Sequence, residues 1–146
     1  YSFGVLHHSP NTPQAFREAC RVLRTGGTAR IMVYHTYSLT GFMLWGKYGL
    51  LKGKPFLPLA EVYSQYLASP GTTAYTKAEA AELCRKAGFS RWNIHIQLNH
   101  GDLLQGAVGQ RHQGLMLRVA KALWPRWLFQ TLTPFLGLYV MIEATK

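Results

Sequence analysis

Two adjacent histidines near the start of the chain are well suited to proton transfer. His7 and His8 follow an apolar run at residues 1–6, whose aromatic and β-branched residues are typical of a buried strand. An unperturbed imidazole titrates near neutrality, so either ring could act as a general base on a substrate hydroxyl. The alternative is that His7 closes the loop structurally and His8 faces solvent. No third ligand stands at a supporting spacing, so we expect no metal site.

Further polar and aromatic side chains follow the next apolar run, residues 29–34, which predicts a second buried strand. Ligands of doubly wound sheets bind outside the carboxyl ends of the strands. We therefore predict a substrate pocket from the side chains near these ends, with ordinary strand-end packing as the alternative: Tyr34, His35, Tyr37 and Tyr75. His100 and Asp102 follow a later predicted strand, residues 89–98, and could reach the same face.

The first two strands enclose a helix pattern. Thr12 is the predicted N-cap, with Pro13 at the first helical position, and Gly26-Gly27 is the predicted left-handed end. One face of this helix is apolar and predicts contact with the sheet; it carries Ala15, Phe16, Ala19, Val22 and Leu23. A strand, a helix and a strand within about 34 residues indicate a βαβ unit and a parallel sheet.

The second half of the chain predicts a clear helix and further strands. Thr76 and Glu79 form a capping box at the start of a helix that ends at Gly88. Residues 89–98 alternate as a strand does, and Trp92, Ile94, Ile96 and Leu98 share one side. A loop at 99–113, a helix at 115–128 and a last strand at 138–144 follow.

Residues 38–67 differ from the rest because they are rich in Gly, Leu, Trp, Tyr and Lys. Pro55 and Pro58 separate two short helical patterns, which we interpret as an inserted helical cap. Three roles fit this composition: a surface helix that packs on the sheet, a lid over a hydrophobic substrate, or a peripheral contact with a membrane surface.

Composition sets the broad class of protein. The 146 residues are 48% hydrophobic and carry a net charge of +10, which suits one globular domain with anionic partners. The basic residues are dispersed, with a diffuse patch at Arg111, His112 and Arg118, so we do not expect nucleic-acid binding. Cys20 and Cys84 lack CxxC partners, which favours a reducing, cytoplasmic setting. The apolar stretch 127–142 falls short of the roughly 20 residues of a transmembrane span.

The opening segment, YSFGVLHHSPNTPQAFREACRVLRTGGTARIMVY, resembles the fourth strand, the following helix and the fifth strand of class I S-adenosylmethionine-dependent methyltransferases, type 11-like. Its two specific pieces are GVLHH before a Pro-containing turn and RVLRTGG, where Thr25 replaces the usual proline. SPGTTAYTKAEAAELCRKAGF is similar to the segment before the sixth strand, and GLYVMIEATK to the seventh strand, which is antiparallel between the fifth and sixth. The resemblance implies an α/β fold: the C-terminal half of a Rossmann-like methyltransferase sheet, strands four to seven, with an inserted helical cap.

The same resemblance implies a partial domain over residues 1–146. We divide it into a strand-helix-strand unit (1–37), a helical cap (38–75) and C-terminal helices and strands (76–146). The family's glycine-rich loop and ribose-binding acidic residue do not occur in this sequence, and we expect them upstream, so the isolated piece should be inactive. S-adenosylmethionine is the implied cofactor, and its methionine part would lie along the first strand end: Ser2, Phe3, Gly4 and Leu6.

The implied function of the full-length parent is transfer of a methyl group from S-adenosylmethionine to a nucleophile. The aromatic insertion and the positive charge favour a small or lipid-like, anionic acceptor. Two alternatives remain open at the level of sequence. One is a non-catalytic binding module that retains half of the methyltransferase fold; the other is a basic nucleic-acid-binding protein.

Overall fold

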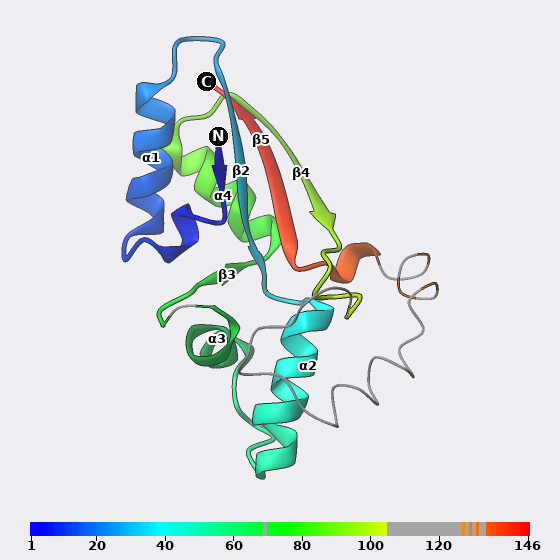
Figure 1. The fold of residues 1–146 in the computed structure, drawn as a ribbon. Coiled ribbons are helices and arrows are strands. Elements are labelled where there is room, and N and C mark those ends of the chain that lie inside the picture. The colour runs from blue at the N-terminus through cyan, green and yellow to red at the C-terminus, as the bar shows by residue number, and fades with distance from the viewer. Residues whose placement is uncertain (69, 105–126, 128, 130, 132–133) are drawn as a thin grey trace.

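A five-stranded sheet organises the chain in this computed structural model, which describes residues 1–68, 70–104, 127, 129, 131 and 134–146 (Figure 1). The strand order is β1 (Ser2–Phe3), β2 (Thr28–His35), β5 (Tyr139–Thr145) and β4 (Arg91–Gln97), and β3 (Ala74–Tyr75) pairs with the end of β2. β1 and β3 are parallel to β2, whereas β5 is antiparallel to both β2 and β4. The α/β class and the antiparallel position of the last strand are therefore confirmed.

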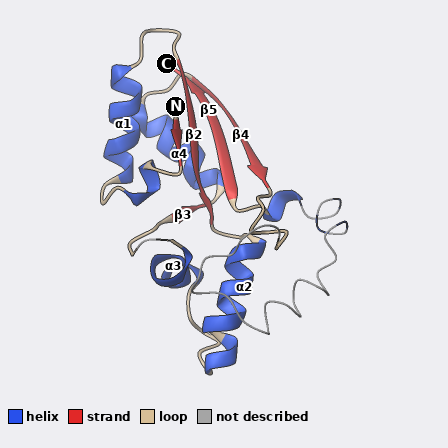
Figure 2. Ribbon diagram, viewed as in Figure 1, coloured by secondary structure: helices blue, strands red, loops and turns tan. Residues whose placement is uncertain are grey.

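Helices α1 (Thr12–Val22) and α4 (Lys77–Ala87) pack side by side on one face of this sheet (Figure 2). Because side chains alternate between the faces of a strand, the core takes every second residue of the strands. Ile31 and Val33 of β2 meet Phe16 of α1 and Leu83 of α4 in the buried cluster. On the opposite face, Phe3 remains 43% exposed. The described helices therefore cover one face of the sheet more fully than the other.

The predicted first helix forms, but its cap and its buried face differ from prediction. Asn11 is the N-cap, because its side chain accepts a hydrogen bond from the Gln14 N–H at 3.0 Å. The prediction of Thr12 was wrong: its hydroxyl instead donates to the carbonyls of the preceding turn. Val22 was also misplaced, since it is 68% exposed, and Cys20 occupies the buried position.

The first strand and the first helix are shorter than the sequence patterns predict. The strand expected over residues 1–6 is limited to Ser2–Phe3, because Gly4 adopts a φ of +73° and turns the chain out of the sheet. α1 ends at Val22 with Leu23 as its C-cap, so the Gly26-Gly27 cap was wrong. Gly26, at φ +76°, instead forms the turn that leads into β2. A glycine in the left-handed region marks a turn as readily as a helix end.

The second half follows the sequence patterns more closely. Thr76 and Glu79 form the predicted capping box, and Gly88 ends α4 at a φ of +92°. β4 and β5 confirm the strands expected near residues 89–98 and 138–144. Strand β3 and a 3₁₀ turn at Pro134–Leu136 were not predicted. The helix expected at 115–128 lies almost wholly outside the described residues, as do Arg111, His112 and Arg118.

The insertion between β2 and β3 is helical, as expected. Helix α2 (Leu39–Tyr48) leads into a 3₁₀ turn (Leu50–Lys52), then into α3 (Leu59–Val62) and a π-helical turn (Tyr63–Leu67). α2 runs away from the end of β2 and packs on α3 and the π-helical turn (Figure 1). The insertion thus extends beyond the carboxyl end of β2.

None of the helices in the described part of the chain is long and apolar enough to cross a membrane.

Candidate functional site

The candidate site begins where the chain leaves β1. After Gly4, residues Leu6–His8 form a 3₁₀ turn, and the Thr12 hydroxyl donates to the Leu6 carbonyl at 3.3 Å. The Gly4 N–H donates to the Met32 carbonyl of β2 at 3.2 Å. These bonds hold the turn against the end of the parallel strand pair. They also place His7 in the interior, with none of its surface exposed.

Three rings meet at this turn. The His7 ring centroid lies 4.2 Å from that of His8 and 4.3 Å from that of Tyr34 on β2. The segment before β3 closes over the pair: Thr72 Oγ1 lies 3.2 Å from His8 Nδ1, and the Thr73 N–H donates to the His7 carbonyl at 3.4 Å. The structure thus brings together His7, His8 and Tyr34, which the sequence analysis had assigned to two separate strand ends.

His7 is buried without partners for its ring. Neither ring nitrogen makes a well-aligned hydrogen bond to a described residue, although the Met32 carbonyl lies close enough to affect the pKa of the ring. Burial lowers its pKa from the ordinary 6.5 to about 4, and the neighbouring His8 acts in the same direction, while the Met32 carbonyl opposes them. Desolvation disfavours the charged imidazolium, so His7 is neutral at physiological pH. A buried polar ring without partners is unusual in a folded protein and indicates a place where a further group could bind.

Tyr34 extends the site along the less covered face of the sheet. Burial and the neighbouring Tyr139 raise the pKa of its phenol, which therefore keeps its proton at neutral pH. Tyr34 and Tyr139 are opposite each other in β2 and β5, with ring centroids 6.4 Å apart. Tyr139 in turn meets Phe3 edge to face at 5.4 Å. The histidine pair thus stands at one end of a row of aromatic rings.

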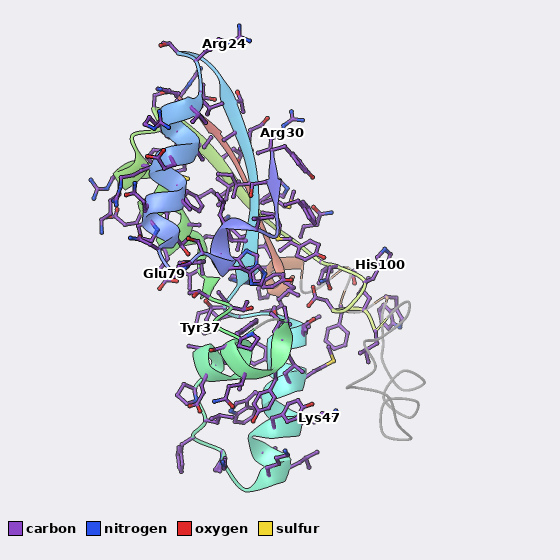
Figure 3. The ribbon with its side chains drawn as sticks, turned by 60° about the vertical axis from the view of Figure 1, so that its left-hand side comes forward. Arg24, Arg30, Tyr37, Lys47, Glu79 and His100 are labelled. Carbon is purple, nitrogen blue, oxygen red and sulfur yellow. The ribbon has the colours of Figure 1, made fainter. Side chains whose placement is uncertain are left out.

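The remaining predicted pocket residues do not join this group. His35 follows Tyr34 in β2, so its side chain points to the opposite face of the sheet. Its Nδ1–H donates to the Gly137 carbonyl at 3.2 Å, and burial lowers its pKa. Tyr37 meets His35 edge to face at 6.2 Å and stands at the start of the insertion (Figure 3). Tyr75, on the same side as His35, packs against the core.

The four residues predicted to bind the cofactor lie in and after β1, with different environments. Ser2 Oγ is buried and lacks a hydrogen-bond partner among the described residues. Phe3 is part of the aromatic row, and Leu6 packs against the core cluster. A Cβ on Gly4 would lie 3.3 Å from Met32 Cε, and its φ of +73° is strained for other residues. The local backbone therefore suffices to explain this glycine.

Asp102 has a structural role in the described structure. It is fully buried, and its carboxylate accepts hydrogen bonds from the Thr40 N–H and hydroxyl, from the Asn99 N–H and from the Leu138 N–H. These bonds join the loop after β4 to the start of α2 and to the segment before β5. His100, its neighbour in the loop, is exposed (Figure 3). Asp102 thus connects three segments and is not presented at the carboxyl end of β1.

A shallow, largely apolar hollow lies on the less covered face of the sheet and not at the histidine pair. It is lined by residues of β1, β2, β4 and β5, among them Tyr1, Phe3, Arg30, His95 and Met141. Arg30 and Glu143 form a cross-strand ion pair of 3.1 Å beside it. This surface continues the row of aromatic rings away from His7.

Two contributors to the site were missed by sequence reasoning. Tyr139 meets Tyr34 only through the antiparallel register of β5 on β2, and a sequence pattern does not fix that register. Thr72 lies in a turn, and only the pairing of β3 with β2 brings it to His8. In the described part of the chain, no three His, Cys, Asp or Glu side chains gather closely enough to hold a metal ion.

Comparison with known proteins gives one family match. Residues 1–31 match the model of a family described as "Methyltransferase domain". The matched segment contains β1, the histidine turn, α1 and the first residues of β2. No curated protein matches the chain. The match thus covers the residues that build the His7 turn, and it supports the resemblance of this chain to the class I S-adenosylmethionine-dependent methyltransferases.

Proposed function

We propose that this chain is the C-terminal half of a class I methyltransferase domain, whose complete form transfers a methyl group from S-adenosylmethionine to a small or lipid-like acceptor. The order and direction of the strands give this proposal its strongest support. A parallel pair, β1 and β2, is followed by a last strand that lies antiparallel between β2 and β4. This arrangement is the one implied by the resemblance for strands four to seven, and the family match covers its first unit.

In this proposal the cofactor lies at the carboxyl end of β1, as ligands do in doubly wound sheets. Ser2, Phe3, Gly4 and Leu6 would hold its methionine part, largely through backbone atoms. The unpartnered Ser2 hydroxyl and the unpartnered His7 nitrogens fit a polar ligand at this place. When bound, S-adenosylmethionine supplies an electrophilic methyl group.

His7 is the side chain that we propose to receive a proton from the acceptor. Its low pKa keeps both ring nitrogens available in the neutral form, one as a hydrogen-bond donor and one as an acceptor. His8 is positioned by its contact with Thr72, and Tyr34 contributes a protonated phenol beside the pair. Much of the rate enhancement would come from orientation of the acceptor rather than from the base, because proximity alone accelerates such transfers strongly.

The acceptor class rests on the surroundings of the site. The aromatic row from Tyr34 to Phe3 offers an apolar surface, and the chain carries a net charge of +10. A lipid-like, anionic acceptor suits both features. The helical insertion, residues 38–75, stands at the carboxyl end of β2 and would border the acceptor, so a lid role remains part of the proposal. We place the protein in the cytoplasm, since Cys20 and Cys84 are free.

The first experiment is to read and express the coding region upstream of Tyr1. The proposal requires a strand, a glycine-rich loop of the GxGxG kind and an acidic residue about 20 positions further on. Calorimetry with S-adenosylmethionine should then show binding to the extended chain and none to residues 1–146. An unrelated upstream sequence, or an extended chain that fails to bind, would overturn the enzyme proposal and favour a non-catalytic binding module.

A further inference from the structure

The outer end of the helical insertion exposes large apolar side chains. Leu50 and Leu51, in the 3₁₀ turn after α2, are 56% and 67% exposed, and Phe56 is 96% exposed. We call residues 47–56 the apolar tip. Single exposed apolar residues are common on protein surfaces, but several within one short segment indicate an interaction site.

The backbone of the tip is held in a defined turn. The Gly49 N–H donates to the Trp45 carbonyl at 2.7 Å, and the Lys54 N–H donates to the Gly49 carbonyl at 2.8 Å. Gly53 has a φ of +69° and caps the 3₁₀ turn. The exposed leucines are therefore presented by a hydrogen-bonded turn. Exposure of these leucines to water is unfavourable for the isolated chain.

Positively charged residues alternate with the apolar residues of the tip. Lys47, Lys52 and Lys54 lie within the tip, and the sequence contains no acidic residue between Glu18 and Glu61. The Nζ atoms of Lys47 and Lys52 lie 5.0 Å and 5.2 Å from the centre of the Tyr48 ring. Tyr48 itself stacks on Tyr66 of the π-helical turn at 4.0 Å. Two ammonium groups therefore lie over the Tyr48 ring, in the same segment as the exposed apolar side chains.

We propose that the apolar tip docks onto an anionic lipid bilayer. The leucines and Phe56 would enter the boundary between headgroups and acyl chains, where burial of apolar area drives binding. The lysines would meet the anionic headgroups, with their flexible stems along the apolar side chains. Charge complementarity selects the occupant, because three lysines with no acidic residue among them in the sequence match a surface of uniform negative charge.

The position of the tip allows this contact. The insertion leads away from the sheet, and Lys47 lies at the opposite end of the molecule from Arg24 (Figure 3). Docking at the tip would therefore leave the sheet and the His7 turn away from the bilayer plane. The proposal rests on the surface of residues 47–56 alone and is independent of methyl transfer.

The test is vesicle flotation of the full chain with palmitoyl-oleoyl lipids, either pure phosphatidylcholine or phosphatidylcholine mixed with anionic phosphatidylglycerol. We expect binding to the anionic vesicles only. L51S/F56S and K52Q/K54Q should each lower the partition coefficient by about tenfold or more. Because the chain is basic throughout, the matched control V22S/R24Q removes one exposed apolar residue and one charge at the other end, and it should retain most of the binding.

A second measurement separates insertion from general attraction of charge. A single environment-sensitive NBD label on F56C should shift its emission to the blue with anionic vesicles, whereas the same label on V22C should not. Cys20 and Cys84 are buried and leave the introduced thiol as the accessible target. Circular dichroism melts confirm that each variant is folded. The proposal is overturned if V22S/R24Q weakens vesicle binding as much as the tip variants do, or if the NBD emission at position 56 does not shift. Neither result bears on S-adenosylmethionine binding.

Discussion

The imidazole of His7 packs against the phenol ring of Tyr34, with their centroids 4.3 Å apart, and neither His7 nitrogen has a hydrogen-bond partner among the described residues. This contact joins the turn after β1 to the end of β2, the two places where a parallel sheet presents its ligands. Burial of the two rings sets the protonation state of the site. Both rings are kept neutral, because burial lowers the pKa of His7 and raises that of Tyr34.

The first prediction concerns acid stability. Folding lowers the pKa of His7 from 6.5 to about 4, so between these values the unfolded chain binds a proton that the folded chain does not. The free energy of unfolding should therefore decrease as the pH falls through this window, by up to about 3 kcal/mol from His7. His35, whose pKa burial also lowers, should add a loss of the same sign.

Urea unfolding of the wild type and His7→Leu, at pH values from 4 to 7.5, measures this effect. The variant should show a shallower decrease of stability towards pH 4. His95→Leu removes an exposed imidazole and serves as the control for loss of a histidine. Parallel pH profiles for wild type and His7→Leu would show that His7 is not held neutral by the fold.

Much of this arrangement follows from sequence, and the exceptions have identifiable causes. The α4 capping box was predictable because all its bonds are local, between Thr76 and Glu79. The N-cap at Asn11 was missed because Asn11 and Thr12 are both good capping residues, and the contact of Thr12 with Leu6 decides between them. Local sequence patterns predict helices and strands well, but they do not show which of two adjacent capping residues is the N-cap.

The other features that the sequence did not predict depend on pairing between strands that are far apart in the sequence. The site draws Tyr139 from a strand more than a hundred residues away, through the register of β5 on β2. Strand β3 has only two residues, Ala74–Tyr75, too few for an alternation pattern, yet it brings Thr72 to His8. The histidine pair was found as a candidate because it is adjacent in sequence, whereas its partners depend on the assembled sheet.

A second prediction concerns the buried hydroxyl of Tyr63, which ties the insertion to the end of β2. Tyr63 Oη donates to the His35 and Thr36 carbonyls at 2.8 Å and 3.0 Å, and it lies 2.7 Å from Ser38 Oγ. Burial raises the pKa of this phenol to about 12, so it acts as a donor throughout the usual pH range. Tyr63→Phe should lower the free energy of unfolding by about 1–3 kcal/mol, since it leaves buried polar groups unpaired.

Chemical denaturation compares Tyr63→Phe with Tyr37→Phe, which removes an exposed phenol hydroxyl. Gly41→Ala tests the same contact from the other side, because a Cβ at Gly41 would collide with the Tyr63 hydroxyl and ring. We expect both Tyr63→Phe and Gly41→Ala to be destabilised, and Tyr37→Phe to be nearly neutral. A neutral Gly41→Ala would mean that α2 is not packed as closely on Tyr63 as the structure has it.

A third prediction concerns Asp102, whose carboxylate accepts hydrogen bonds from three separate segments. Asp102→Ala removes both accepting oxygens, so the N–H groups of Thr40, Asn99 and Leu138 lose their shared acceptor. Loss of charge-assisted bonds in the interior should lower the free energy of unfolding by about 2–3 kcal/mol. Hydrogen exchange of the Leu138 and Thr40 amides should accelerate together, while amides of α4 should change only with global stability. Unchanged protection at Leu138 would contradict the proposed connection.

The last prediction tests the role of His7 in methyl transfer by the chain extended upstream. A base with a pKa of about 4 is already neutral throughout the physiological range, whereas an ordinary imidazole would lose half its activity near pH 6.5. With proton transfer to His7, kcat/KM should therefore stay flat from pH 8 down to about pH 5 and fall only below it. His7→Gln should lower kcat more than it lowers the affinity for S-adenosylmethionine, because the proposed cofactor residues would hold the cofactor largely through backbone atoms. Loss of activity centred near pH 6.5, with full activity in His7→Gln, would assign the proton to a group other than His7.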